Sequence, residues 1–555
     1  MNEEVFDELK NNNRYIDTLW IWNNHQYDFD PLNIDWGREG DSLADNTHLK
    51  SLDISCRRES PDNAREQRYA ERNAKAFYRA LSKNKSIKYL KIRGCIGNLA
   101  MSDTLSILSP FIENNTKLRS LELGGCIVND RFALLFESAL LRCNTSLQRI
   151  ELNRCEGMTA DIMEKIINVV GSQGIQELYL DEYDWDDEVA AALGDTLCTN
   201  NTLKVLSLGG EQFDHQQGRI GSMDSTGVEA ITEFLSTPPS SSLKELSFRN
   251  NQIGPLGGIA LAEALEGNTT LKRLDLYSAV SPWYGEHTLT SQGWTTFFES
   301  LHNCAFHSLN LGGNTIEDGD VASMVEALNS FSSLETLNLR KATSITSSGW
   351  VAFFNLLAQP GSALERLKKL DIEGSSITDE VMISIANALV NSISLKKLGW
   401  CHQERVADRG WSALTNILCN KTTIETICNS NHTLLRVGII SPGKVNKLTR
   451  LNNGTNKAEV ARQKIIRCYF LEGKGSNLHE IMNMDFVLLP HVIECFGKQA
   501  MEVPKGTYGS ARIGSTKYTI KVDSGFELLY RLARGMPSLF DTRGKVLGGK
   551  RKRKA

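Results

Sequence analysis

The chain carries aromatic, basic and acidic side chains in patterns that suit binding, and it lacks the residue spacings that suit catalysis. The sequence has no G-x-x-x-x-G-K-[ST], H-E-x-x-H or G-x-S-x-G segment, and its 10 histidines are dispersed. Such segments cradle nucleotide phosphates, hold a catalytic zinc or present a serine nucleophile. We therefore expect a protein that is not an enzyme, that holds no metal or cofactor and that has no small-molecule substrate.

One segment concentrates acidic and aromatic side chains. Residues 181–188 read DEYDWDDE, which places six carboxylates around Tyr183 and Trp185. A basic partner could dock on such a loop. Asp186 and Asp187 also stand where they could cap the following helix and favour its positive N-terminal end, and we favour this structural role. Calcium binding is a third option, but the segment lacks the glycine and the spacing of an EF-hand loop.

A repeat with a period of about 28 residues decides where these side chains can lie. Between residues 16 and 434 the frame L-x-x-L-x-L recurs, as in KLRSLEL (117–123), TLKRLDL (270–276) and SLETLNL (333–339). Each copy predicts a short parallel strand, which can bury its apolar face only by stacking on its neighbours. The frame predicts fourteen strands, whose central residues are Leu19, Leu52, Leu90, Leu121, Ile150, Leu178, Leu206, Leu246, Leu274, Leu309, Leu337, Leu370, Leu398 and Ile427.

Turn and helix signals separate the predicted strands. The segments between them carry apolar residues at helical spacing and begin at capping residues such as Ser225, Asp318 and Asp379. In many copies a small polar side chain follows the frame, where it can bond turn backbone that would otherwise stay unpaired. These side chains are Asn24, Cys95, Cys126, Cys155, Asn251 and Asn314.

Two recurrent motifs are expected to be structural. The tryptophans of the Gly-Trp pairs follow predicted helix caps, so we expect them to pack between repeats. The N-x-S/T triplets recur just before the strands, where turn chemistry explains them better than glycosylation. The tryptophans are Trp294, Trp350 and Trp411, and the triplets begin at Asn114, Asn144, Asn200, Asn268, Asn420 and Asn431.

The unit of strand, turn, helix and turn resembles that of the ribonuclease-inhibitor-like leucine-rich repeat proteins, over about three quarters of the chain. The resemblance implies an α/β solenoid shaped as a horseshoe, with parallel strands inside and helices outside. It does not imply a function, because members of this family bind unrelated partners.

The sequence divides into four regions. We expect an N-terminal cap with a first atypical repeat over residues 1–48 and leucine-rich repeats over residues 49–435. Residues 436–540 predict a helical C-terminal capping region, and residues 541–555 a basic disordered tail.

The C-terminal region leaves the repeat frame. Its helical patterns cover residues 459–470, 477–496 and 526–536, and the Gly-rich residues 503–525 predict a mobile loop or a small hairpin. The order of ARQKI, LPHVI and LLYRLARGMPSLFD is similar to that in leucine-rich repeat proteins of unicellular algae, a likeness that implies no activity. Closure of the last strand is the role we favour, with a partner site as the alternative.

The predicted inner face offers candidate partner-binding residues, because strand side chains alternate and those beside the frame leucines point to solvent. Aromatic and arginine side chains on such a face are typical anchors of protein interfaces. Fourteen strands give a face of about 700 Å², close to the ~800 Å² that each partner buries in a standard interface. The candidates are Trp20, Trp22, Tyr89, Lys91, Arg93, Arg149, Glu151, Tyr179, Asp181, Arg273, Asp275 and Tyr277.

Two inserts interrupt the repeats, at residues 211–225 and 277–291. Loops that lengthen on a rigid scaffold are common recognition sites. Trp283 and Tyr284 are the candidate anchors in the second insert, with packing back onto the solenoid as the alternative.

Two functions fit these features. The first is a nonenzymatic scaffold that binds a protein partner on its inner face. The second is a regulator of a small GTPase, because the Ran GTPase-activating protein has a similar repeat and one arginine can stabilise a transferring phosphoryl group. Arg57, Arg58 and Arg93 are the candidate arginines. Against the second function, animal and fungal activators of this type end in an acidic segment, whereas this chain ends in a basic one.

Composition predicts an intracellular location, in the nucleus or the cytoplasm. The net charge of −4 over 555 residues implies no bulk attraction to nucleic acid or membrane, and no 18-residue apolar run occurs. The 12 cysteines lack C-x-x-C spacing, so we expect small buried thiols in a reducing compartment, such as Cys143, Cys198 and Cys419.

The last residues form a basic run after a Gly-Gly pair. Such a run stays extended, and it resembles a nuclear localisation signal that a nuclear import receptor would bind; a merely solvated tail is the alternative. The run consists of Lys550, Arg551, Lys552, Arg553 and Lys554.

Overall fold

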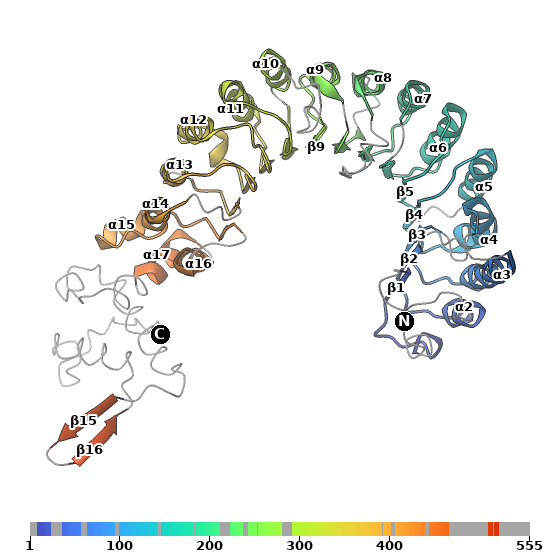
Figure 1. The fold of residues 1–555 in the computed structure, drawn as a ribbon, viewed down its shortest axis with the longest axis horizontal. Coiled ribbons are helices and arrows are strands. Elements are labelled where there is room, and N and C mark those ends of the chain that lie inside the picture. The colour runs from blue at the N-terminus through green and yellow to red at the C-terminus, as the bar shows by residue number, and fades with distance from the viewer. Residues whose placement is uncertain are drawn as a thin grey trace, which may run out of the picture.

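In the computed structural model the chain forms an open arc, with a parallel sheet on the inner curve and helices on the outer curve (Figure 1). The fourteen strands of this sheet follow one another in chain order, so each repeat pairs only with the repeats beside it. This arrangement confirms the predicted α/β solenoid. The structure describes residues 8–23, 36–56, 64–94, 99–142, 146–182, 185–210, 223–236, 242–251, 253–279, 291–302, 304–390, 392–400, 406–438, 443–454, 456–465, 509–513 and 516–520.

The strands of the solenoid are short, and most of the helices between them run for about three turns, with α3 the longest at 18 residues. The strands are β1 (Thr18–Asn23), β2 (Ser51–Cys56), β3 (Tyr89–Arg93), β4 (Ser120–Gly124), β5 (Arg149–Asn153), β6 (Glu177–Tyr179), β7 (Val205–Ser207), β8 (Glu245–Ser247), β9 (Arg273–Asp275), β10 (Ser308–Asn310), β11 (Thr336–Asn338), β12 (Lys369–Asp371), β13 (Lys397–Gly399) and β14 (Arg436–Val437). The helices between them are α2 (Trp36–Ala44), α3 (Ala64–Leu81), α4 (Met101–Asn114), α5 (Asp130–Leu141), α6 (Ala160–Ser172), α7 (Asp187–Leu197), α8 (Ser225–Ser236), α9 (Gly254–Ala264), α10 (Ser291–Ser300), α11 (Val321–Ser330), α12 (Ser347–Leu357), α13 (Asp379–Leu389) and α14 (Asp408–Leu418), with the short α15 (Ile424–Cys428) and the 3-10 segments η4 (Asp318–Asp320) and η5 (Ala363–Glu365).

The register of the sheet aligns the frame residues of successive repeats. Leu19 lies beside Leu52, Leu52 beside Leu90, and the alignment continues without a break to Leu398. Each of these thirteen predicted residues is at most 5% exposed. The core is therefore one continuous apolar column between sheet and helices.

The fourteenth strand lies ten residues after the predicted position. Val437, not Ile427, pairs with Leu398, and Ile427 is buried in α15 instead. The segment around Ile427 imitates the frame, but Thr423 and Thr426 cap each other at the start of α15 and direct it into a helix. The true copy is TLLRVGI (433–439), in which valine takes the central leucine position.

Two buried asparagines connect their turns to the neighbouring repeat. Asn251 donates to the carbonyl of Leu208 at 2.5 Å and accepts from the nitrogen of Met223 at 3.0 Å. Asn314 donates to the carbonyls of Leu276 and Leu311, both at 2.9 Å. Both positions confirm the predicted turn role, because a buried amide with several partners stabilises the turn it closes.

The N-x-S/T triplets also behave as turn residues where they are described. Asn431 is buried, donates to the carbonyl of Leu389 at 3.0 Å and accepts from the nitrogen of Leu434 at 3.0 Å. Asn200 and Asn268 accept in the same way from the nitrogens two and three residues later. Asn114 differs, because it ends α4 and the adjacent Asn115 takes the turn position. Asn144 lies outside the described residues.

Two of the predicted cap residues act on the next repeat rather than on their own helix. Asp318 accepts from the Thr346 nitrogen at 2.8 Å and from Ser348 Oγ at 3.0 Å, at the start of α12. Asp379 accepts from the Gly410 nitrogen at 3.2 Å, at the start of α14. Burial acts to raise the pKa of Asp318, but the hydrogen bonds outweigh burial and lower the pKa. The third residue, Ser225, begins α8 and is preceded by the actual cap, Asp224.

These carboxylates explain the glycines of two of the three Gly-Trp pairs. A Cβ on Gly349 would lie 2.1 Å from Asp318 Oδ1, and one on Gly410 would lie 2.7 Å from Asp379 Oδ1, so only glycine leaves room for the carboxylate. Trp294 and Trp350 are fully buried, which confirms their packing role. Trp411 is half-buried and lies 5.0 Å from the ring of Trp400.

Beyond β14 the described chain includes α16 (Gly443–Leu451) and α17 (Lys457–Lys464), and α16 packs against α14 and β14. Within the predicted loop or hairpin at 503–525, β15 (Gly509–Ile513) and β16 (Thr516–Ile520) form an antiparallel pair. The remaining residues of the predicted C-terminal helices fall outside the described part. None of the described helices combines the length and the apolar character needed to cross a bilayer.

Truncation of a frame leucine is expected to destabilise the solenoid. Leu246 is 2% exposed in the centre of β8, so Leu246→Ala should lower the free energy of unfolding by about 2–5 kcal/mol. Leu256→Ala is the matched control, because Leu256 in α9 is 67% exposed. Urea unfolding followed by circular dichroism measures both, and equal midpoints would contradict the repeat assignment.

Candidate functional site

The inner face presents the side chains that flank the frame leucines. Trp20 on β1 is 66% exposed and Tyr89 on β3 is 49% exposed, so both aromatic rings reach solvent as predicted. Trp22 also lies in β1, but its side chain falls outside the described part. Strands β1 and β3 lie on the concave side of the arc (Figure 1). The exposed rings of Trp20 and Tyr89 therefore add aromatic surface near its N-terminal end.

A buried carboxylate organises the third and fourth strands. Glu122 on β4 is 5% exposed and binds Lys91 Nζ at 2.8 Å and Arg93 Nε at 2.6 Å. Both cations come from β3, whose Lys91 lies directly beside Glu122 in the sheet. The predicted candidates Lys91 and Arg93 are thus brought together, and one acidic residue that the sequence reading omitted holds them.

Arg149 joins the neighbouring strands β5 and β6 in a second network. Its Nε lies 2.5 Å from Glu151, and its Nη1 lies 3.2 Å from Glu177 and 3.1 Å from the Tyr179 hydroxyl. The guanidinium also stacks over the Tyr179 ring, 4.0 Å from its centre. These contacts fix the arginine in one geometry, as is typical of a preorganised binding surface.

The carboxyl and hydroxyl groups of this network have shifted pKa values. Burial raises the pKa of Glu151, and the neighbouring charge of Glu122 raises it further, against the opposing charge of Arg149. Burial also raises the pKa of Tyr179 to about 12, so the hydroxyl stays protonated and can donate at neutral pH. For Arg149, burial acts to lower the pKa, but Glu151, Tyr179 and Glu177 together outweigh burial and raise the pKa. The arginine therefore stays charged.

The acidic segment 181–188 does not form a carboxylate cluster among its described residues. Asp181 is mostly buried and accepts from Ser207 Oγ at 2.7 Å and from the Gly209 nitrogen at 2.6 Å, and burial raises its pKa. Glu182 forms an ion pair with Arg154.

The helix-cap interpretation of this segment is confirmed. Asp186 caps α7 by accepting from the Val189 nitrogen at 2.7 Å. Trp185 packs against the core, whereas Tyr183 and Asp184 lie outside the described residues.

The ninth strand repeats the same pattern. Arg273 forms an ion pair with Glu245 of the preceding strand. Asp275 accepts from the Tyr277 nitrogen at 3.0 Å and from Asn310 Nδ2 at 2.8 Å, and burial raises its pKa. Tyr277 is half-buried under the guanidinium of Arg249, whose central carbon lies 4.8 Å from the ring centre.

The ionic partners lie one period apart in sequence. Arg149 and Glu177 are 28 residues apart, and Arg93 and Glu122 are 29 apart. With the strands aligned, Arg149 stands directly opposite Glu177, and Glu122 stands opposite Lys91 with Arg93 two residues further along β3. Opposite charges at matching or nearby positions of successive copies were therefore the available signal for these pairs.

A shallow hollow lies where β3, β4 and β5 end. It has a volume of about 560 Å³ and lies between Arg93 and Arg154, over the Gly124-Gly125 backbone. A Cβ on Gly124 would lie 3.0 Å from the carbonyl oxygen of Asn153, so a side chain at this position would crowd the neighbouring strand. Both arginines are engaged by glutamates, which makes the hollow a polar surface of mixed charge.

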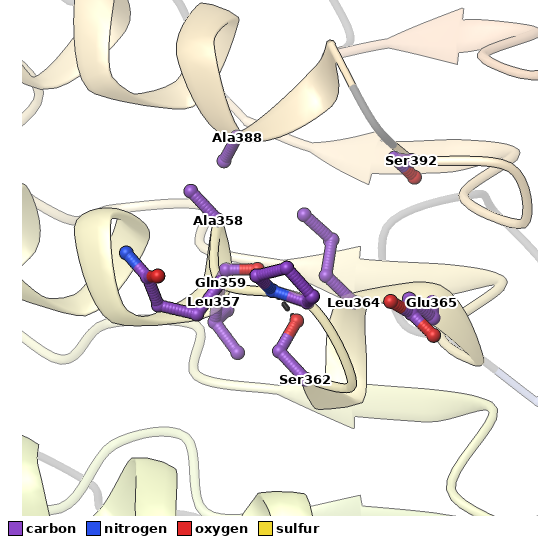
Figure 2. Close-up of a pocket in the computed structure, with 9 residues that line it drawn as sticks. Leu357, Ala358, Gln359, Ser362, Leu364, Glu365, Ala388 and Ser392 are labelled. Atoms are coloured by element: carbon purple, nitrogen blue, oxygen red, sulfur yellow. Dashed lines mark hydrogen bonds between the residues drawn. The ribbon is translucent and has the colours of Figure 1, made fainter.

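A smaller pocket of about 250 Å³ lies away from the strands, between the end of α12, η5 and the end of α13 (Figure 2). Ser362 Oγ donates to the Leu357 carbonyl at 2.6 Å, and Glu365 accepts from the Gly361 nitrogen at 2.7 Å. Glu365 is the one titratable side chain that lines this pocket, so the pocket offers no acid and base pair. The described residues contain no group of His, Cys, Asp and Glu that could hold a metal ion.

Several predicted residues fall outside the described part of the chain: Arg57, Arg58, Cys143, Trp283, Tyr284 and the basic run from Lys550 to Lys554. Of the predicted thiols that are described, Cys419 is buried and Cys198 half-buried.

The chain is similar to proteins of different activity. A family model described as "Leucine Rich repeat" matches residues 240–262. Over 341 residues the chain is 22% identical to ribonuclease inhibitor of Mus musculus, a match that covers 60% of this chain and 69% of that protein. Over 324 residues it is 21% identical to Rho GTPase-activating protein gacW of Dictyostelium discoideum, covering 56% of this chain and 26% of that protein. The chain thus matches only about a quarter of the second relative.

Two solved structures show a distant similarity over part of the chain. The Rad7 and Elc1 complex of yeast gives a TM-score of 0.41 at 15% identity, covering 74% of this chain and 91% of that chain. The leucine-rich repeat-containing protein LegL7 of Legionella pneumophila gives 0.33 at 14% identity, covering 54% of this chain and 89% of that chain.

Removal of the Glu122 charge is expected to lower the pKa of Glu151. The substitution Glu122→Gln removes a negative charge that raises this pKa and leaves the burial of Glu151 in place. Carbon-13 NMR titration of labelled glutamate carboxyl groups measures the shift, with Glu245→Gln in β8 as the control. An unchanged Glu151 titration in Glu122→Gln would show that the two carboxylates do not interact.

Proposed function

Because the chain is a ribonuclease-inhibitor-like leucine-rich repeat protein, we propose that it is a nonenzymatic scaffold whose concave face binds a protein partner. The observation that carries the proposal is the exposure of Trp20 and Tyr89 on that face. Large aromatic side chains anchor interfaces, because they bury much area and lose few rotamers on binding.

The order of the neighbouring side chains supports the same proposal. Glu122 holds Lys91 and Arg93, and Arg149 is fixed by Glu151, Glu177 and Tyr179. A surface whose polar groups are already ordered loses less conformational entropy when a partner binds. The N-terminal strands β1–β6 therefore combine exposed anchors with a preformed polar surround.

Regulation of a small GTPase is the second candidate function. The similarity to a Rho GTPase-activating protein favours it, although the match spans about a quarter of that protein. The geometry of Arg93 is unfavourable, because an arginine finger must reach a bound nucleotide and this guanidinium is bound to Glu122 at 2.6 Å. We therefore rank this function below the scaffold.

Nuclear entry through the basic run at residues 550–554 stays a prediction of the sequence. A run of five basic residues suits the acidic groove of an import receptor, whereas a solvated tail would have no effect on location.

Loss of an aromatic anchor is expected to weaken partner binding. After affinity purification and mass spectrometry have identified a partner, Trp20→Ala and Tyr89→Ala should each weaken its affinity by at least about 2 kcal/mol, or roughly 30-fold. Tyr69→Ala is the control, because Tyr69 is 54% exposed on α3 of the outer curve. Unchanged affinity in both anchor variants would overturn the concave-face proposal.

A GTP-hydrolysis assay separates the two functions. We expect the chain to leave the hydrolysis rates of Ran-type and Rho-type GTPases unchanged. The outcome that would contradict the scaffold is faster GTP hydrolysis that is lost in Arg93→Ala and kept in the control Arg131→Ala on α5. The chain would then be a GTPase regulator and not only a scaffold.

Removal of the basic run tests nuclear entry. A fluorescent fusion that lacks residues 549–555 should shift from nucleus to cytoplasm relative to the full-length fusion. Equal distributions of the two fusions would show that the run is a solvated tail.

A further inference from the structure

The last three strands carry a row of basic side chains. Lys369 on β12 lies directly beside Lys397 on β13, which lies beside Arg436 on β14. All three are exposed, whereas the frame residues that follow them are buried. Adjacent strands are about 4.8 Å apart, so the row places three positive charges in close succession. Like charges directly opposite in a sheet oppose its stability.

This row differs from the basic residues of the earlier strands. Lys91, Arg93, Arg149 and Arg273 each have a glutamate partner on their own or an adjacent strand. Among the described residues, no carboxylate forms an ion pair with Lys369, Lys397 or Arg436.

The surroundings of the row add further positive charge. Lys396 precedes Lys397 and is exposed, and Lys368 precedes Lys369 and pairs with Glu335 at 2.5 Å. The acidic side chain of β12, Asp371, accepts from the Glu373 nitrogen at 3.1 Å. Its carboxylate lies against Gly399, where an added Cβ would lie 2.5 Å from Oδ1. The local excess of positive charge contrasts with the net charge of −4 of the whole chain.

We propose that the row formed by Lys369, Lys397 and Arg436 binds an acidic α-helical segment of a protein partner. The charge complementarity comes from the uncompensated cations, which an acidic partner would neutralise. The spacing also fits, because carboxylates three and four residues apart on a helix are about 5–6 Å apart, close to the spacing of the strands. A helix laid across β12–β14 would therefore meet one cation at each turn.

The aromatic content of this surface decides against nucleic acid. Single-stranded nucleic acid binds where aromatic rings offer stacking platforms beside the cations. Among the described residues of β12–β14 and their flanks, the aromatic side chain is Trp400, and it is buried. The proposal goes beyond the proposed function, because it rests on charge in the last repeats and not on Trp20 or Tyr89.

The test uses the full chain and a labelled peptide probe. The probe is an alanine-based helix of about 20 residues with glutamates on one face, and the matched probe carries glutamine at the same positions. The triple variant Lys369→Glu, Lys397→Glu, Arg436→Glu removes the row. The control triple variant Lys83→Glu, Lys85→Glu, Lys117→Glu makes the same change of net charge at exposed positions of the early repeats.

Fluorescence anisotropy measures the outcome, with circular dichroism to show that all variants are folded. We expect the acidic probe to bind the unsubstituted chain and Trp20→Ala equally, and to bind the row variant at least about tenfold more weakly. Affinity should also fall with added salt. Equal losses in the two triple variants, equal binding of the glutamine probe, or absence of binding would overturn the proposal. If oligouridylate RNA bound more tightly than the acidic probe, and the row variant lost this binding, the ligand of the row would be nucleic acid and not a protein.

Discussion

Each repeat of this chain depends on its neighbours to bury the strand that it contributes. The central residues from Leu19 to Val437 align in one register, and every one of them is nearly removed from solvent by the repeats on either side. Buried asparagines such as Asn251 and Asn314 connect the turns, and Asp318 and Asp379 connect the helix starts of successive repeats. The solenoid is thus stabilised by nearest-neighbour interfaces, and its inner face is a consequence of their register.

That register also distributes charge over the inner face. Because strands pair in chain order, residues one period apart become neighbours, and Arg149 meets Glu177 as Arg93 meets Glu122. Where these ion pairs form, the charges of the inner face are balanced. Two other parts of the described face are not balanced in this way, one with exposed apolar area and one with unpaired positive charge. Trp20 and Tyr89 offer apolar area near the N-terminal end, and Lys369, Lys397 and Arg436 offer positive charge at the other end.

The sequence predicts the fold well because the period and the frame leucines are both visible in it. It fails at β14, where valine replaces leucine and a threonine-capped helix around Ile427 imitates the frame. It also misassigns the caps Asp318 and Asp379, because their hydrogen bonds reach a helix about 28 residues away. Alternation along the strands predicts that the candidate residues of the inner face point to solvent, as Trp20 and Tyr89 do. It does not predict the burial of Asp181 and Asp275, which follows from side-chain packing.

The central claim is that the concave face binds a protein partner, and hydrogen–deuterium exchange of the captured complex tests it most directly. Exchange slows where a partner covers backbone or stabilises local structure. The account predicts that binding slows exchange in peptides from β1–β6, around Trp20, Tyr89 and Arg149, and leaves the outer helices α3–α7 unchanged. Slower exchange confined to those outer helices, with the strands unaffected, would contradict it.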